Sequence, residues 1–280
     1  MPTDLLFGVR GLCAAHPGGP EVLHDIDLDL PRGSFVAVIG PNGCGKSTLL
    51  LCLARLLRPS RGTVDFNGQP LNSATPRALA RRLAFLPQQP LAPDGIRVRD
   101  LVMRGRHPHR RLLLPPGAAD HQAVDEAMAV GGVADLADAR LAELSGGQRQ
   151  RAWIAMALAQ QTSTILVDEP TSFLDIAHQV DVLETCSQLV ARGHDVIAVL
   201  HDLSLACRHA DLLVVMSAGR VVAVGSPTQV MTVPLVMDVF DLPCRIISDP
   251  ETSTPLVVPR RHHTAASQGT SPITATKEHP

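Results

Sequence analysis

Phe35-Val-Ala-Val-Ile-Gly40-Pro-Asn-Gly-Cys-Gly-Lys46-Ser-Thr48 is the stretch that decides the fold of this 280-residue chain. Its first five residues form a continuous apolar run, which is typical of a strand buried on both faces of a parallel sheet. Residues 47–57 then indicate a helix that ends before Pro59. A glycine-rich turn between such a strand and helix lets backbone N–H groups converge on a phosphate. The stretch therefore predicts an α/β core that binds a nucleotide.

The spacing of two glycines, Lys46 and Ser47 in this turn predicts a role for each polar side chain. Lys46 brings a positive charge to the β- and γ-phosphates, Ser47 offers its hydroxyl to Mg²⁺, and Thr48 lies near the α-phosphate. The N-terminus of the following helix adds partial positive charge. A dinucleotide-binding fingerprint is not supported, because no G-x-G-x-x-G is completed. We expect the whole turn to contact the nucleotide, through Gly40, Pro41, Asn42, Gly43, Cys44, Gly45, Lys46, Ser47 and Thr48.

A second apolar run, Ile165-Leu-Val, ends in the carboxylates Asp168 and Glu169. At the end of a buried strand, Asp168 can hold Mg²⁺ through water, and Glu169 can polarise a water in line with the γ-phosphate. Two acids after a strand are equally consistent with a solvated loop. The phosphate-binding turn earlier in the chain favours the catalytic interpretation.

The rest of the chain alternates strand and helix patterns, which predicts a mainly parallel sheet. Residues 5–12 and 22–30 indicate an antiparallel edge sheet, and Asn67-Gly68 after residues 62–66 indicates a hairpin. Further strands are expected at residues 83–86, 164–168, 195–201, 212–216 and 220–225, and helices at 154–160, 176–192 and 203–209. Between about 93 and 151 the patterns are helical, at residues 98–105, 120–131 and 133–137, and indicate a helical subdomain inserted into the core.

Composition narrows the class of protein. Aromatic residues make up 2% of the chain, so the core is aliphatic, and a net charge of −2 gives no general footprint for nucleic acid. No apolar run reaches the length of a transmembrane helix, and the N-terminus does not read as a secretory signal. The six cysteines lack C-x-x-C pairs and zinc spacing, which predicts buried thiols in a reducing cytoplasm. Residues 259–280, rich in Ser, Thr, His and Pro, are expected to form a disordered tail.

Three motifs in chain order carry a family resemblance: the phosphate-binding turn, Leu-Ser-Gly-Gly-Gln-Arg-Gln at 144–150, and Val-Asp-Glu-Pro at 167–170. Together they resemble the ATP-binding cassette (ABC) ATPases over residues 1–258. The resemblance implies a P-loop NTPase (RecA-like) core, an antiparallel β subdomain and an inserted helical subdomain, with ATP and Mg²⁺ as cofactors. Because two phosphate-reading motifs lie about a hundred residues apart, we expect the site to close between two copies of the chain.

The resemblance also implies roles for single residues. Gln88 looks like the glutamine that senses Mg²⁺ and the γ-phosphate, and His201 looks like the histidine that contacts the γ-phosphate. Without that context, Gln88 would be a polar loop residue and His201 a structural one. Ser172-Phe-Leu-Asp175 resembles the loop that crosses to the other copy. The segment that contacts the partner's ATP is expected to comprise Ser145, Gly146, Gly147 and Gln148.

One position departs from the family. The place of the aromatic residue that stacks on adenine falls near Ala14-Ala15-His16. His16 is the only ring there, and an imidazole stacks less well than tyrosine.

Several stretches are similar to the ATPases of importers for ferric siderophores and related iron chelates. They lie at residues 40–48, 98–109, 148–160, 174–183, 199–203 and 244–259. The resemblance implies an ATPase at the cytoplasmic face of the cell membrane. Its partners would be integral permease subunits, a second copy of itself and, indirectly, a substrate-binding protein, with no nucleic acid. Importers of vitamin B12 or haem and exporter ATPases remain alternatives, as do a soluble ABC ATPase acting on DNA or ribosomes and a non-hydrolysing binding module.

Two features admit more than one interpretation. A basic cluster comprises Arg104, Arg106, His107, His109, Arg110 and Arg111. A solvated loop is favoured over a nucleic-acid site, which would need interleaved aromatics, and the family resemblance adds a rim that docks a permease loop. The pairs His107/His109 and His262/His263 lack a completing set of metal ligands. Cys44 is either a thiol made reactive by the helix start, with alkylation prevented by ATP, or a small residue that the turn tolerates.

Overall fold

The centre of the molecule is a six-stranded sheet with the strand order β10-β9-β3-β8-β7-β6. The computed structural model describes residues 5–110, 114–172 and 174–260. Neighbouring strands of this sheet are parallel, except for the antiparallel pair β9 and β10. The predicted mainly parallel sheet is confirmed. Its strands are β3 (Phe35–Ile39), β6 (Leu83–Leu86), β7 (Thr164–Asp168), β8 (Asp195–Val199), β9 (Leu212–Ser217) and β10 (Arg220–Gly225).

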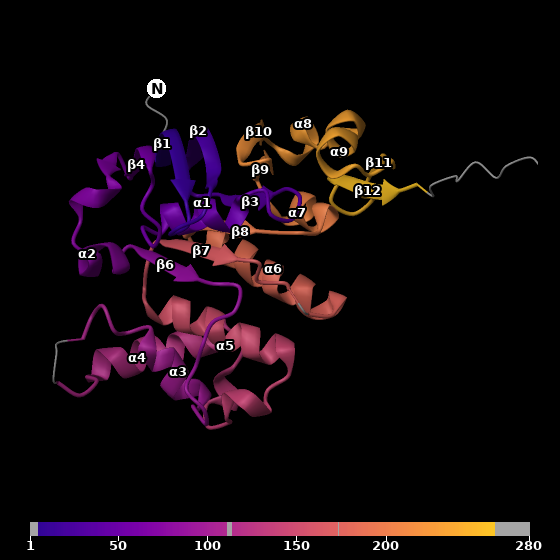
Figure 1. Cartoon of the computed structure of the whole chain (residues 1–280). Coiled ribbons are helices and arrows are strands. Elements are labelled where there is room, and N and C mark those ends of the chain that lie inside the picture. Colours follow the sequence, from indigo (N-terminus) through magenta and orange to yellow (C-terminus); the bar gives the residue numbers. More distant parts are fainter. Residues whose placement is uncertain (1–4, 111–113, 173, 261–280) are drawn as a thin grey trace, which may run out of the picture.

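A second, antiparallel sheet covers one face of the first, with helix α1 (Lys46–Leu53) between the two (Figure 1). Alternate residues of β3 point to opposite faces, as the strand geometry requires. Val36 and Val38 join the apolar cluster of α1 and the antiparallel sheet, whereas Phe35, Ala37 and Ile39 join the cluster on the helical side. The antiparallel strands are β1 (Leu5–Ala15), β2 (Glu21–Pro31), β4 (Arg61–Phe66) and β5 (Gln69–Pro70).

Helices α3 (Val98–Arg104), α4 (Ala118–Val130) and α5 (Gly146–Ala159) pack against one another on the far side of the central sheet (Figure 1). Helices α3 and α4 correspond to the helical patterns predicted at residues 98–105 and 120–131. Helix α6 (Ile176–Ala191) packs against α5 and β8, and α7 (Leu203–His209) packs against α6 and β3. No helix within the described residues has the length and hydropathy needed to cross a bilayer.

Two helix boundaries differ from the prediction. The helix after the phosphate-binding turn ends at Leu53 rather than at residue 57, because Arg55 has a left-handed φ of 57° and donates to the carbonyls of Leu71 and Ala74. Helix α5 begins at Gly146 rather than at residue 154. Its N-cap is Ser145, whose hydroxyl accepts from the Gln148 N–H, and this cap offsets the low helix propensity of two glycines.

The remaining elements are short and were not predicted. They are α2 (Pro76–Ala80), α8 (Pro227–Val230), α9 (Val233–Phe240), β11 (Cys244–Ser248), β12 (Pro255–Pro259) and the 3₁₀ turns at Leu71–Ser73 and Leu141–Glu143. The helical pattern predicted at residues 133–137 is a 3₁₀ turn, Ala134–Leu136. The expected tail lies outside the described residues, apart from Pro259 in β12 and Arg260. All six cysteines are buried and free, as predicted.

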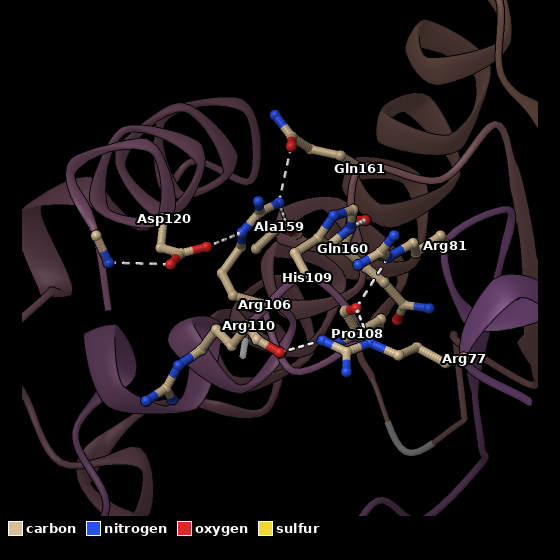
Figure 2. Close-up of polar contacts among 11 residues, drawn as sticks. Arg77, Arg81, Arg106, Pro108, His109, Arg110, Asp120, Ala159, Gln160 and Gln161 are labelled. Carbon is tan, nitrogen blue, oxygen red and sulfur yellow. Dashed lines mark hydrogen bonds and ion pairs between the residues drawn. The ribbon is translucent and has the colours of Figure 1, made fainter. Parts of the chain in front are cut away.

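The basic cluster near α3 is only partly solvated: Arg104 and His107 are exposed, whereas Arg106 is not. Arg106 is 5% exposed, and its Nε donates to Asp120 of α4 at 2.9 Å (Figure 2). The same guanidinium donates to the carbonyl of Ala159 at 2.8 Å and to Gln161 at 2.7 Å. Although desolvation opposes ionisation, the hydrogen bonds from Arg106 and from the Gly117 N–H hold the pKa of Asp120 below its usual value. Arg106 therefore joins the ends of three helices by a buried, charge-assisted network. Arg111 lies outside the described residues.

The same segment connects these helices to the central sheet. Arg77 and Arg81 of α2 both donate to the carbonyl of Pro108, at 2.9 and 3.0 Å (Figure 2). His109 donates to the carbonyl of Gln160 at 2.7 Å, and the Gln160 side chain donates to the carbonyl of Leu83 at 3.1 Å. We call this set of contacts around residues 106–110 the polar junction.

We expect Arg106→Met to destabilise the fold by about 3–5 kcal/mol, because it leaves a poorly hydrated carboxylate and carbonyl without their donor. The matched control is Arg104→Met, which removes an exposed arginine two residues earlier, at the end of α3, and should change the free energy of unfolding by about 0.5 kcal/mol or less. Urea denaturation of both variants measures the difference. Equal stability of the two would contradict a structural role for Arg106.

Candidate nucleotide-binding site

The predicted site residues meet at one edge of the central sheet. The loops that follow β3, β6, β7 and β8 carry the phosphate-binding turn, Gln88, Glu169 and His201. The carboxyl ends of parallel strands lie at the same edge, which is where ligands bind in open α/β sheets. A cavity of about 690 Å³ is present there, lined by His16, Val22, Asn42, Gly43, Gly45, Lys46, Ser47, Thr48, Gln88, Glu169 and His201.

The turn after β3 has the backbone that phosphate binding requires. Gly40, Gly43 and Gly45 have φ values of 155°, 76° and 102°, in the region that favours glycine. A Cβ at Gly40 would lie 2.8 Å from the Cys44 sulfur, and one at Gly45 would lie 2.7 Å from a methyl of Leu23. Larger residues at either position would push the turn out of shape.

Lys46 is 5% exposed, and its Nζ donates to the carbonyls of Gly40 and Pro41, each at 2.9 Å. Among the described residues, no carboxylate forms an ion pair with it. Asp168 carries a charge of opposite sign that interacts with Lys46 without forming an ion pair, so, within the part of the chain that the structure describes, the hydrogen-bond partners of the buried ammonium are carbonyls only. This charge, at the base of a cavity, favours an anionic ligand.

Ser47 and Asp168 supply adjacent oxygen atoms. The Ser47 hydroxyl donates to Asp168 Oδ1 at 2.9 Å, which links the first turn of α1 to the end of β7. Burial raises the pKa of Asp168, and the hydrogen bond from Ser47 opposes this shift. Mg²⁺ at nucleotide sites takes one or two protein oxygens and completes its shell with phosphate and water. The pair therefore fits Mg²⁺, whereas Gln88 hydrogen-bonds to Glu169 instead.

Glu169 is held by two hydrogen-bond donors and a close imidazole. Its carboxylate accepts hydrogen bonds from Gln88 and from the Ser172 hydroxyl, the latter at 2.9 Å, and His201 Nε2 lies 2.5 Å from the other oxygen. The residue has a φ of 49°, a left-handed conformation that costs free energy for a non-glycine residue. The strand end and these donors fix the carboxylate at the wall of the cavity, 12% exposed.

His16 lines the cavity beside Val22, and its Nε2 lies 3.1 Å from the Thr48 hydroxyl. The contact ties the end of β1 to the first turn of α1. Val22 was not predicted, because a single valine in an edge strand carries no sequence signal for a ligand. It gives this wall of the cavity an apolar surface next to the imidazole.

The other predicted nucleotide contacts lie elsewhere. Within the described residues, the cavity lining includes neither Ser145–Gln148 at the start of α5 nor Asp175 at the start of α6. The side chains of Ser145 and Asp175 are exposed. This distance from the cavity of their own copy is what we expect of residues that contact the nucleotide held by a second copy. Phe173, in the predicted crossing loop, lies outside the described residues.

Cys44 does not have the environment of a reactive thiol. It is 6% exposed, and burial raises the pKa of its thiol despite the nearby charge of Lys46. The prediction of a lowered pKa is therefore wrong, because the desolvation of the thiolate outweighs its position before a helix. The alternative, a small residue packed in the turn, agrees with the contact between Cys44 and Gly40.

Comparison with known proteins agrees with this geometry. Residues 23–172 match the family model for ABC transporters. The chain is 47% identical to the ferric enterobactin transport ATP-binding protein FepC of Escherichia coli (strain K12), over 86% of this chain and 90% of that protein. It is 46% identical to the achromobactin transport ATP-binding protein CbrD of Dickeya dadantii (strain 3937), over 85% and 89% of the two chains.

A solved structure of a metal-chelate type ABC transporter in an inward-facing conformation is similar to the model, with a TM-score of 0.80. It is 28% identical, and the match covers 92% of this chain and 99% of that one. Both the sequence motifs and the arrangement of the two sheets and the helical layer are thus found in proteins of one class. The chain belongs to the ABC transporter family, as one of its ATP-binding, ATP-hydrolysing proteins.

Proposed function

We propose that this chain is the ATP-hydrolysing subunit of an importer of ferric siderophores, and that two copies work together beneath a membrane permease at its cytoplasmic face. The observation that supports hydrolysis is the cavity, which holds a buried lysine charge and a fixed carboxylate at one sheet edge. The transport assignment draws on the similarity to siderophore transport proteins over most of the chain.

In this proposal the triphosphate lies on the turn at residues 40–48. Backbone N–H groups and the helix N-terminus surround the phosphates, and Lys46 supplies the charge that its carbonyl partners leave uncompensated. Ser47 and Asp168 would hold Mg²⁺, with Gln88 nearby, and the ion would neutralise charge on the phosphate oxygens. His16 and Val22 would contact the base in place of the aromatic residue that stacks on adenine in the family.

Glu169 is the proposed general base. Its position at the wall of the cavity suits a carboxylate that orients a water molecule toward the γ-phosphate and accepts its proton. Gln88, Ser172 and His201 hold the carboxylate before nucleotide binds. Gln88 and His201 also have polar atoms that can turn toward the γ-phosphate, so ATP competes with Glu169 for these donors.

The second copy completes the site. Ser145–Gln148 and Asp175 are the residues proposed to contact the nucleotide held by the partner. ATP then favours the closed pair because it contacts both copies, and hydrolysis followed by phosphate release removes those contacts. This difference in affinity between closed and open states is what can move a permease and expose the chelate to the cytoplasm.

Glu169→Gln should retain ATP binding but lower kcat about 10²–10⁴-fold, because the amide cannot accept the proton from water. The variant should also accumulate an ATP-dependent dimer, visible by size-exclusion chromatography. Glu184→Gln, an exposed change on α6, is the matched control and should behave like the native chain. A normal kcat for Glu169→Gln would exclude this residue as the base.

Lys46→Ala should abolish nucleotide binding within the range that a titration with fluorescent ATP can measure, because the loop carbonyls remain but the charge is lost. Lys277, the second of the chain's two lysines, provides a control in Lys277→Ala, which should bind ATP normally. Unchanged ATP affinity in Lys46→Ala would contradict the proposed contact with the phosphates.

The transport assignment predicts that cells whose only copy of this protein carries Glu169→Gln lose uptake of ⁵⁵Fe-labelled ferric siderophore. Uptake of haem and of labelled cobalamin in the same cells should persist, because other permeases serve them. An affinity-tagged native chain should co-purify with an integral membrane permease. Loss of haem or cobalamin uptake alone would assign the subunit to that chelate, and co-purification with ribosomes or DNA would overturn the transporter assignment.

A further inference from the structure

Gly147 is buried, although Ser145 and Gly146 on the same turn are exposed. The imidazole of His178, in the first turn of α6, covers Gly147. A Cβ at Gly147 would lie 2.5 Å from Cγ and 2.9 Å from Nε2 of His178, and closer still to Cδ2. Real Cβ atoms do not approach a ring this closely, so the ring rests directly on the backbone of the first turn of α5. Gly147 has no left-handed φ, and the lack of a side chain is needed for space alone.

The other side of the same ring contacts Asp175. Nδ1 of His178 lies 2.5 Å from Asp175 Oδ1, and the backbone N–H of His178 donates to that oxygen at 3.0 Å. Asp175 is thereby the N-cap of α6, and its side chain is fixed toward His178. Gln179 adds a hydrogen bond to the carbonyl of Leu174 at 3.0 Å, which closes the loop that leads from Glu169 to the helix.

His178 therefore joins two segments that are far apart in sequence. One segment is the turn at residues 145–148, which we call the signature turn, and the other is the loop that ends at Asp175. The helices that follow them, α5 and α6, pack against each other. Within the described residues, the lining of the phosphate cavity does not include His178. Its contacts are with the two groups that, under the function proposed above, must reach the partner's nucleotide at the same time.

We propose that His178 is a positioning residue that sets the spacing between the signature turn and Asp175, so that both meet the nucleotide held by the second copy. This inference rests on the proposed function, since it concerns how the two halves of the site close. The ring is the spacer, and the hydrogen bond to Asp175 fixes its orientation. A displacement of about 1 Å in such a group can lower a rate about 10²-fold without loss of binding elsewhere.

The experiment compares His178→Ala, His178→Asn and His178→Phe. Asparagine places a donor where Nδ1 lies and keeps the bond to Asp175, whereas phenylalanine keeps a planar ring against Gly147. For His178→Ala we expect kcat for ATP hydrolysis to fall about 10–10²-fold. The affinity of the monomer for ATP should change by no more than about twofold, as for a site without shared partners. His178→Asn and His178→Phe should each recover part of kcat.

His194→Ala is the matched control. It removes another half-buried histidine, bonded to the carbonyl of Thr162 just beyond the far end of α6, and should leave kcat within about twofold of the native value. A kcat for His178→Ala equal to that of His194→Ala overturns the inference. A fall in ATP affinity and in the unfolding midpoint alongside kcat also overturns it, because that pattern belongs to a merely structural histidine.

The same three changes, made in the Glu169→Gln chain, separate this inference from the proposed function. If Glu169→Gln forms an ATP-dependent dimer and the added His178→Ala weakens that dimer, the inference holds. If the dimer forms equally well with His178→Ala, the positioning role fails and the proposed function stands. If the native chain and Glu169→Gln bind ATP but never dimerise, the two-copy function itself fails.

Discussion

The structure of the site depends on one constraint: the ammonium of Lys46 is buried, and the described residues offer it only carbonyls as hydrogen-bond partners. Lys46 is anchored by two loop carbonyls, and the loop above it can take its shape only with glycine at Gly40 and Gly45. Such an ammonium is costly in a closed protein and is stabilised when an anion occupies the cavity. The buried strand before the loop and helix α1 after it hold the turn in place from both sides. The chain therefore folds around a site that is electrostatically incomplete, and the phosphates of the nucleotide complete it.

Glu169 was predicted from an acidic pair after a buried strand, whereas Gln88 and His201 were assigned through the resemblance to ABC ATPases. Their proximity follows from the sheet, because the parallel strands β6, β7 and β8 are neighbours and end at the same edge. The contacts among them were not predictable. Glu169 has a left-handed backbone, two hydrogen-bond donors and the imidazole of His201 beside it, and none of these follows from an Asp-Glu pair after an apolar run. A strand pattern locates a residue at an edge, but side-chain partners depend on loops whose conformations the pattern does not specify.

Where sequence reasoning was wrong, tertiary contacts overrode local preference. Arg55 ends α1 early because it turns back to bond two carbonyls, although the residues around it favour a helix. Arg106 belongs to a charged stretch that reads as solvated, yet it is buried because the start of α4 and the end of α5 offer it acceptors. At Cys44 two effects on the thiol pKa oppose each other. A helix start favours the thiolate, but burial removes the water that would solvate it, and the pKa is raised. In each case the outcome depends on which groups are buried, and burial cannot be read from the charge and spacing of residues in a sequence.

Helix α5 links the signature turn at one of its ends to the polar junction at the other. Its first turn carries the signature residues and rests on His178, and its last turn is held by Arg106 and, through Gln160, by the polar junction. A helix of 14 residues is about 21 Å long and bends little, so movement at one end must appear at the other. The polar junction ties that far end to α2 and β6, the strand that precedes Gln88. Any rotation of α3, α4 and α5 relative to the sheet must therefore change the contacts of the junction or displace the signature turn. The contact of His178 with Gly147 in turn holds the signature turn against α6.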